Sequence, residues 1–109
     1  FADLHLHTHF SDGTFSPEEV VARGSTAGLV ALALTDHDTV EGCERMTAAC
    51  AAAQIEFITG TELTAEHEDI ELHILGYFID TENQNLLREL ARFQIVRQNR
   101  IREMVARLN

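Results

Sequence analysis

Short apolar runs alternate with polar, glycine-containing segments along roughly the first half of the chain. Residues 1–6 fit a short strand. Residues 29–34 form a continuous apolar run, which is typical of a strand buried on both faces. Residues 55–59 predict a third short strand, which ends at Gly60. Three strands are therefore expected, separated by segments long enough to hold a helix each.

Helix signals fill both intervals between these strands. Ser16 and Pro17, followed by two glutamates, are typical of a helix start, because serine caps the first turn and proline fits its first position. That helix is expected to end at Gly28, and residues 40–54 predict an alanine-rich second helix. The order strand, helix, strand, helix, strand predicts an α/β fold with right-handed crossovers and a parallel sheet.

The remainder of the chain has a different pattern. Residues 61–65 and 70–78 fit extended segments around a charged turn, and residues 83–109 fit one long amphipathic helix. We therefore divide the chain into residues 1–80, a body that contains the sheet, and residues 81–109, the helix.

Charge is distributed unevenly between these two parts. The formal net charge is −10. Residues 1–80 hold 15 of the 18 acidic residues and only two arginines, whereas residues 81–109 hold six arginines. An acidic body disfavours a nonspecific grip on nucleic-acid backbones and suits a protein that gathers carboxylates around cations, although a solvated acidic surface explains many of these residues equally well.

The composition and the cysteine spacing predict a globular protein of the cytoplasm. Hydrophobic residues make up 45% of the chain, as in ordinary globular proteins, and no apolar stretch approaches the ~18 residues that span a bilayer. Cys43 and Cys50 lie two helical turns apart in the second predicted helix, too far for a disulfide. Because no signal-peptide pattern is visible, we expect a cytoplasmic protein with reduced, packed cysteines and no membrane contact.

Histidines and carboxylates gather where the predicted strands end. His5 and His7 are two residues apart, so a strand points both imidazoles to the same side. Asp12, His37 and Glu62 each follow a different predicted strand. Because the carboxyl ends of parallel strands share one edge of a sheet, these side chains are expected to meet there. This combination favours a metal site.

His73 lies in an apolar extended stretch, between Leu72 and Ile74. Taken alone it fits a core histidine, but beside the other candidates it fits a further ligand. A ligand set of imidazoles and carboxylates without thiolates fits several divalent metals. Manganese is the metal that we expect, and iron, zinc and magnesium are the alternatives. The sequence has no Ser–His–Asp or Cys–His pattern and no phosphate-binding glycine loop. The expected nucleophile is therefore a metal-bound hydroxide that attacks a phosphate ester.

Three motifs resemble those of the polymerase and histidinol phosphatase (PHP) superfamily. They are Asp3-Leu4-His5-Leu6-His7-Thr8-x-x-Ser11-Asp12-Gly13, Thr35-Asp36-His37-Asp38-Thr39 and Gly60-Thr61-Glu62, and His73-Ile74-Leu75-Gly76-Tyr77 follows at a fitting distance. The resemblance runs from the first residues to about residue 78. It implies the N-terminal part of a distorted (β/α)7 TIM-like barrel that carries two to three divalent cations at its mouth.

The resemblance also implies a role for each ligand. By that likeness, the first cation is held by His5 and His7, the second by Asp12 and His37, and the third by His73, with Glu62 bridging the first and third. The family pattern further includes a later histidine and a closing Asp-x-His, which this sequence lacks. We therefore expect this chain to be a fragment that comprises about half of a barrel.

Other polar residues near the motifs match no ligand position. Asp3, Asp36 and Asp38 fit either acceptors that orient imidazoles or surface acids of the loops. His9 and His67 are expected to face solvent.

The long C-terminal helix offers candidates for substrate binding. Its predicted apolar stripe consists of Leu86, Leu90, Phe93, Ile101, Met104 and Leu108. Arg97 and Arg100 fall within that stripe. A guanidinium matches phosphate bidentately, so both arginines are predicted to bind a substrate phosphate. The alternative is structural pairing with acids of the body, or a helix end that projects past the core. In superfamily members that process nucleotides, an inserted helical subdomain begins near this point.

The resulting hypothesis is a metal-dependent phosphoesterase that acts on small nucleotides of the nucleoside 3′,5′-bisphosphate type or trims short RNA. Histidinol-phosphate phosphatase is the alternative within the same superfamily. A polymerase-attached editing domain fits less well, because nothing polymerase-like accompanies the motifs. The rival from another class is a non-catalytic metal-binding domain whose cluster only stabilises the fold. The sequence leaves the oligomeric state open.

Overall fold

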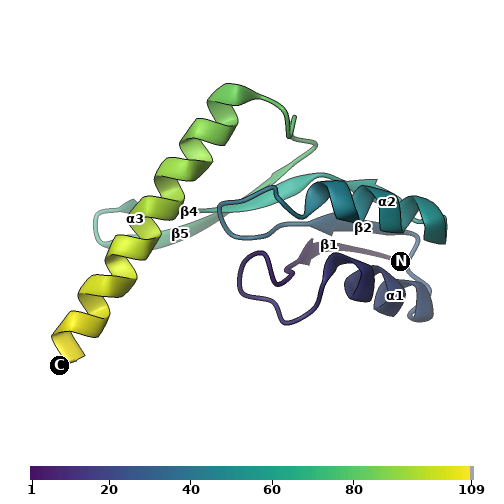
Figure 1. Cartoon of the computed structure of the whole chain (residues 1–109), viewed down its shortest axis with the longest axis horizontal. Coiled ribbons are helices and arrows are strands. Elements are labelled where there is room, and N and C mark those ends of the chain that lie inside the picture. Colours follow the sequence, from purple (N-terminus) through teal and green to yellow (C-terminus); the bar gives the residue numbers. More distant parts are fainter. Residues whose placement is uncertain (109) are drawn as a thin grey trace.

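Strands and helices alternate through the first part of the computed structural model, which describes residues 1–108 (Figure 1). The elements along the chain are β1 (Ala2–Leu6), α1 (Pro17–Thr26), β2 (Ala31–Leu34), α2 (Cys43–Ala53), β3 (Glu56–Ile58), β4 (Gly60–His67), β5 (Ile70–Tyr77) and α3 (Gln84–Leu108). The predicted order of elements is confirmed, and the ends of the elements differ from the prediction by a few residues at most.

The strands β1, β2 and β3 form a parallel sheet in that order. In the central strand β2, Leu32 pairs with Asp3 of β1 and with Phe57 of β3. This position explains the continuous apolar run of the sequence, because Leu32, Ala33 and Leu34 are all buried. The predicted parallel sheet is confirmed, and the carboxyl ends of its strands lie at one edge.

The strands β4 and β5 form an antiparallel hairpin, which joins the sheet through the start of β4. The Glu62 amide donates to Asp36 O, and the Asp38 amide donates to Glu62 O, both at 3.0 Å. Gly60 is required at this junction, because a Cβ there would lie 2.8 Å from two backbone carbonyl oxygens. The strands of residues 1–108 thus form an open sheet and a hairpin rather than a closed barrel.

The helices α1 and α2 pack together on one face of the sheet, as right-handed crossovers between neighbouring parallel strands require. α1 begins with the predicted cap: Ser16 Oγ accepts a hydrogen bond from Glu19 N, and the Glu19 carboxylate accepts one from Ser16 N. The core between these helices and β2 consists of Val20, Val21, Leu32, Leu34, Cys43, Met46, Cys50 and Ile55.

Cys43 and Cys50 are free thiols buried in this core. Burial raises the pKa of both thiols above the ordinary value, which leaves them protonated and weakly nucleophilic. The structure thus confirms the prediction of packed cysteines without a disulfide.

The C-terminal half of α3 projects away from the sheet (Figure 1). Leu90 is buried, whereas Ile101, Met104 and Leu108 of the predicted apolar stripe are 53%, 58% and 86% exposed. The stripe therefore packs against the body only in its N-terminal part. Among the described residues, the structure contains no helix with the length and apolarity that a bilayer crossing needs.

Candidate metal centre

Side chains from three strands and two loops converge at the edge where β1 and β2 end. β1 and the loop after it supply His5, His7 and Asp12, the loop after β2 supplies His37, and the hairpin supplies Glu62 and His73. The structure thus brings together all six residues that the sequence predicts as metal ligands.

Glu62 lies at the centre of this group, and its side chain is only 6% exposed. Glu62 Oε1 lies 2.6 Å from His5 Nε2 and 3.5 Å from His7 Nε2. Glu62 Oε2 lies 2.9 Å from His73 Nδ1 and 3.2 Å from His37 Nδ1. One buried carboxylate therefore contacts four imidazoles.

The imidazoles control the ionisation of Glu62. Burial acts to raise the pKa of this carboxyl, but the hydrogen bond with His5, the charge of His37 and the hydrogen bond with His73 outweigh it. The pKa of Glu62 is therefore lowered below its usual range. This keeps the carboxylate ionised, which is the form that binds a cation.

Asp12 closes the opposite side of the group. Its Oδ2 lies 3.1 Å from His37 Nε2, and its Oδ1 lies 3.4 Å from His7 Nδ1. The rings of His7 and His37 stack with their centroids 4.6 Å apart. Each of these two imidazoles consequently turns one nitrogen toward Asp12 and the other toward Glu62.

The ligand atoms fall into three overlapping groups, within each of which all atoms lie within 4.8 Å of one another. The groups are His5 with His7 and Glu62, His7 with Asp12 and His37, and His37 with Glu62 and His73. Nitrogen and oxygen ligands lie at about 2.0–2.2 Å from a transition-metal ion, so atoms spaced in this way can share one. His7, His37 and Glu62 each belong to two groups, as expected of a cluster with shared ligands.

Two nitrogens of the centre lack hydrogen-bond partners. His7 Nδ1 and His37 Nδ1 are buried and form no hydrogen bond with any described residue. Burying a polar atom without a partner is costly, and a bound cation removes that cost. Since imidazole nitrogens and carboxylate oxygens are ligands of divalent metals, the residues present fit a cluster of divalent cations.

Buried hydrogen bonds tie together the two loops that carry the ligands. Asp36 is fully buried, and its carboxylate accepts hydrogen bonds from Thr8 N and Thr8 Oγ1, both at 2.6 Å. It also accepts one from Ser11 Oγ at 2.8 Å. The loop that carries His7 and Asp12 is thereby fixed to the loop that follows β2.

The structure corrects the predicted roles of the three other aspartates. Asp36 and Asp38 are buried, so they are not surface acids, and they accept hydrogen bonds from the loop after β1 and from Thr64 N rather than from imidazole rings. Asp3 Oδ1 accepts from the backbone N–H of His5 at 3.1 Å. Asp3 and Asp36 therefore accept from backbone and hydroxyl groups, whereas Asp38 accepts from a backbone amide and also pairs with Arg97.

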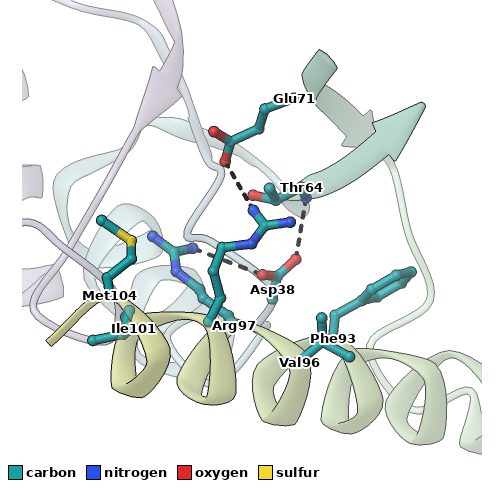
Figure 2. Close-up of a pocket in the computed structure, with 9 residues that line it drawn as sticks. Asp38, Thr64, Glu71, Phe93, Val96, Arg97, Ile101 and Met104 are labelled. Atoms are coloured by element: carbon teal, nitrogen blue, oxygen red, sulfur yellow. Dashed lines mark hydrogen bonds and ion pairs between the residues drawn. The ribbon is translucent and has the colours of Figure 1, made fainter. Parts of the chain in front are cut away.

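Helix α3 places its two candidate arginines in different surroundings. Arg97 lines a hollow of about 440 Å³ whose wall also includes Asp12 and His37. Arg97 Nη1 lies 3.7 Å from Asp38 Oδ2 and is buried without a hydrogen bond to any described residue (Figure 2). Arg97 is thus the arginine that borders the candidate metal centre.

Arg100 lines a second hollow, of about 230 Å³, between α3 and the hairpin. Its guanidinium pairs with Glu66, and its Nη1 lies 3.6 Å from Glu71 Oε1. In this structure Arg100 thus pairs with acids of the body, and its predicted contact with substrate stays a prediction.

One residue near the metal centre, Gln94, is not among those predicted from the sequence. Gln94 lines the larger hollow together with Arg97 and donates a hydrogen bond to Asp38 O at 2.8 Å. Its position three residues before Arg97, on the same side of a helix, is the signal that identifies it.

His9 and His67, which are predicted to face solvent, are exposed.

The sequence matches known proteins over nearly its whole length. The model of the PHP domain family matches residues 3–106. The chain is 36% identical over 102 residues to a 5′-3′ exoribonuclease from Haemophilus influenzae and 37% identical over 106 residues to a 3′,5′-nucleoside bisphosphate phosphatase from Chromobacterium violaceum. These matches cover 94% and 97% of this chain but 37% of each relative. The chain therefore spans little more than a third of the length of these curated relatives.

Solved structures of similar proteins have the same fold over this region. The chain superposes on an amidohydrolase from Chromobacterium violaceum with a TM-score of 0.92, and on a protein described as a metal-dependent phosphoesterase from Bifidobacterium adolescentis with a TM-score of 0.90. Both are 36% identical in sequence, and the matches cover 98% of this chain and 38% and 37% of those chains.

Proposed function

Since this chain belongs to the PHP domain family, we propose that it forms part of a metal-dependent phosphoesterase. The proposed substrates are small nucleotides of the nucleoside 3′,5′-bisphosphate type or short RNA. The observation that carries the proposal is the meeting of four imidazoles on the buried carboxylate of Glu62.

Two lines of support favour the nucleotide substrates. The relatives include proteins named 3′,5′-nucleoside bisphosphate phosphatase and 5′-3′ exoribonuclease. The net charge of −10 disfavours binding along a long polyanion, so a small nucleotide or a short chain end suits this protein better.

The centre is proposed to hold two to three divalent cations, and manganese is the favoured metal. The ligands are His5, His7, Asp12, His37, Glu62 and His73. Such cations supply Lewis acidity, which acidifies a water molecule and offsets the charge on phosphoryl oxygens. The chain itself keeps Glu62 ionised and fixes the stacked rings of His7 and His37 between two carboxylates.

We further propose that residues 1–80 form the N-terminal part of a (β/α)7 TIM-like barrel and that α3 begins an inserted helical subdomain. The parallel order β1-β2-β3 supports the first proposal, together with the position of the ligands at the carboxyl edge, where barrel enzymes carry their sites. The projecting half of α3 supports the second.

The function is tested by hydrolysis assays on the purified protein loaded with Mn²⁺. We expect phosphate release from adenosine 3′,5′-bisphosphate, loss of at least about 100-fold in rate after treatment with EDTA, and recovery when Mn²⁺ is added back. Short 5′-phosphorylated RNA and histidinol phosphate are the parallel substrates that separate the branches of the family. A protein that binds two or three manganese ions but cleaves none of the three would be a non-catalytic metal-binding domain instead.

Arg97 and Arg100 are the proposed substrate contacts on α3. Arg97 borders the hollow beside Asp12 and His37, so we propose that it binds the phosphate nearest the cations. Arg100 lies three residues further along the helix, and we propose that it exchanges its acidic partners for a second, more distant phosphate.

Arg97→Ala is expected to raise KM for adenosine 3′,5′-bisphosphate by about tenfold or more with a smaller effect on kcat, because a charge-assisted hydrogen bond contributes about 1.5–3 kcal/mol. His7→Ala should instead lower kcat, because it weakens cation binding. Steady-state kinetics on both variants make the comparison. Arg92→Ala, which removes an exposed arginine paired with Glu89 on the same helix, is the matched control. An unchanged KM in Arg97→Ala would remove that residue from the substrate site.

A further inference from the structure

Asp38 directly follows the candidate ligand His37 and is almost fully buried, with 1% of its surface exposed. Its backbone φ is 54°, in the left-handed region that aspartate and asparagine tolerate better than most residues. A buried carboxylate in an uncommon backbone conformation is costly, so its contacts must offset that cost.

The main chain and the carboxylate of Asp38 each contact both β4 and α3. Its N–H donates to Glu62 O at 3.0 Å, and its C=O accepts from Gln94 Nε2 at 2.8 Å. Its Oδ1 accepts from Thr64 N at 3.4 Å, and its Oδ2 lies 3.7 Å from Arg97 Nη1 (Figure 2). Asp38 thus links the loop of one candidate ligand to the strand of another and links both to α3.

The guanidinium of Arg97 forms an ion pair with Asp38, but its Nη1 donates no hydrogen bond to any described residue. That nitrogen is buried. The same side chain lines the hollow that Asp12 and His37 border. The carboxylate of Asp38 therefore attracts the guanidinium to this place and leaves N–H groups for an anion.

We propose that Asp38 is a positioning residue that presents Arg97 to a substrate phosphate and couples the docking of α3 to the metal centre. This inference rests on the proposed function. Without the carboxylate, the long arginine side chain samples other rotamers, and substrate binding must then order it. Ordering one such side chain costs about 0.5–1.5 kcal/mol, which corresponds to about 2–10-fold in affinity.

Asp38→Asn is the test variant, because asparagine keeps the shape, suits the left-handed backbone and removes only the charge. In the Mn²⁺-loaded protein, we expect KM for adenosine 3′,5′-bisphosphate to rise about 2–10-fold, while kcat and manganese content stay at the wild-type level. Loss of manganese would make Asp38 a structural support of His37 and would overturn the proposal. Asp38→Gly, which also suits this backbone, replaces the asparagine variant if that variant does not fold.

A double-mutant cycle shows whether Asp38 acts through Arg97. The cycle consists of Asp38→Asn, Arg97→Gln and the double variant. If the proposal holds, the double variant has the same KM as Arg97→Gln alone. Effects that multiply would mean that the two residues act independently and would reject the coupling.

A matched control separates the presentation of Arg97 from a general loosening of α3. Leu90→Val trims a buried side chain of the same helix and leaves Asp38, Arg97 and Arg100 unchanged. KM for adenosine 3′,5′-bisphosphate should be unchanged in this variant. A rise equal to that of Asp38→Asn would assign the effect to helix docking alone and overturn the proposal.

Calorimetric binding of adenosine 3′,5′-bisphosphate distinguishes failure of this inference from failure of the proposed activity. If the wild-type protein binds the nucleotide but does not hydrolyse it, the proposed activity is wrong. The double-mutant cycle is then measured as Kd values instead of KM values. Equal Kd values for wild type and Asp38→Asn overturn the inference whether or not hydrolysis occurs. A wild-type protein that binds no nucleotide overturns both.

Discussion

Replacing Glu62 with glutamine is expected to remove the tightly bound cations and to lower kcat/KM by at least about 100-fold. This loss exceeds the roughly 10–100-fold that follows when a residue hydrogen-bonded to a metal ligand is removed, because Glu62 is itself a candidate ligand. Glutamine keeps the shape of the side chain but loses its charge and one ligand oxygen. Glu62 belongs to two of the three ligand groups, so its loss affects two cation positions at once. Metal analysis after gel filtration, together with phosphate release from adenosine 3′,5′-bisphosphate, measures both effects.

Two further variants define how specific this effect is. Glu68→Gln makes the same chemical change at the exposed turn of the same hairpin, where the side chain is 82% exposed, and should leave cation content and activity unchanged. His5→Ala removes a ligand that belongs to only one group and should retain more metal than Glu62→Gln. Full cation content in Glu62→Gln would show that this carboxylate is not a shared ligand.

The position of the candidate ligands could be predicted because it follows from short-range patterns and one topological rule. His5 and His7 share a side because strand side chains alternate. His37 and Glu62 follow separate apolar runs, and right-handed connections bring the ends of such strands to one edge. The predicted convergence did not require knowledge of any loop conformation.

The supporting contacts could not be predicted because they depend on how loops fold back on one another. Asp36 and Asp38 lie on either side of His37 in sequence, yet one binds the loop after β1 and the other contacts α3. The polar residue Thr8 is completely buried, which no pattern along the chain indicates. The apolar stripe of α3 identifies a packing face, but it does not say that Leu108 lies beyond the body that this face covers.

Asp36→Ala is expected to lower the free energy of unfolding by about 3–5 kcal/mol, the largest loss of stability that we predict for a single substitution in this chain. The carboxylate is fully buried and accepts hydrogen bonds from Thr8 N, Thr8 Oγ1 and Ser11 Oγ. Alanine leaves the buried amide and hydroxyl of Thr8 without an acceptor for their protons and opens a cavity beside them. Urea denaturation of the cation-free protein measures the loss without a contribution from metal binding.

The same substitution should also weaken manganese binding by about 10–100-fold, because Asp36 fixes the loop of His7 and Asp12 against the loop of His37. Asp36→Asn keeps the shape and one acceptor oxygen, so it should lie between alanine and wild type in both measurements. Glu44→Ala, at an exposed position of α2, should change stability by no more than about 0.5 kcal/mol. If Asp36→Ala were as stable as this control but bound manganese poorly, the aspartate would orient the ligands without holding the fold together. The two measurements therefore separate its contribution to the fold from its contribution to the metal centre.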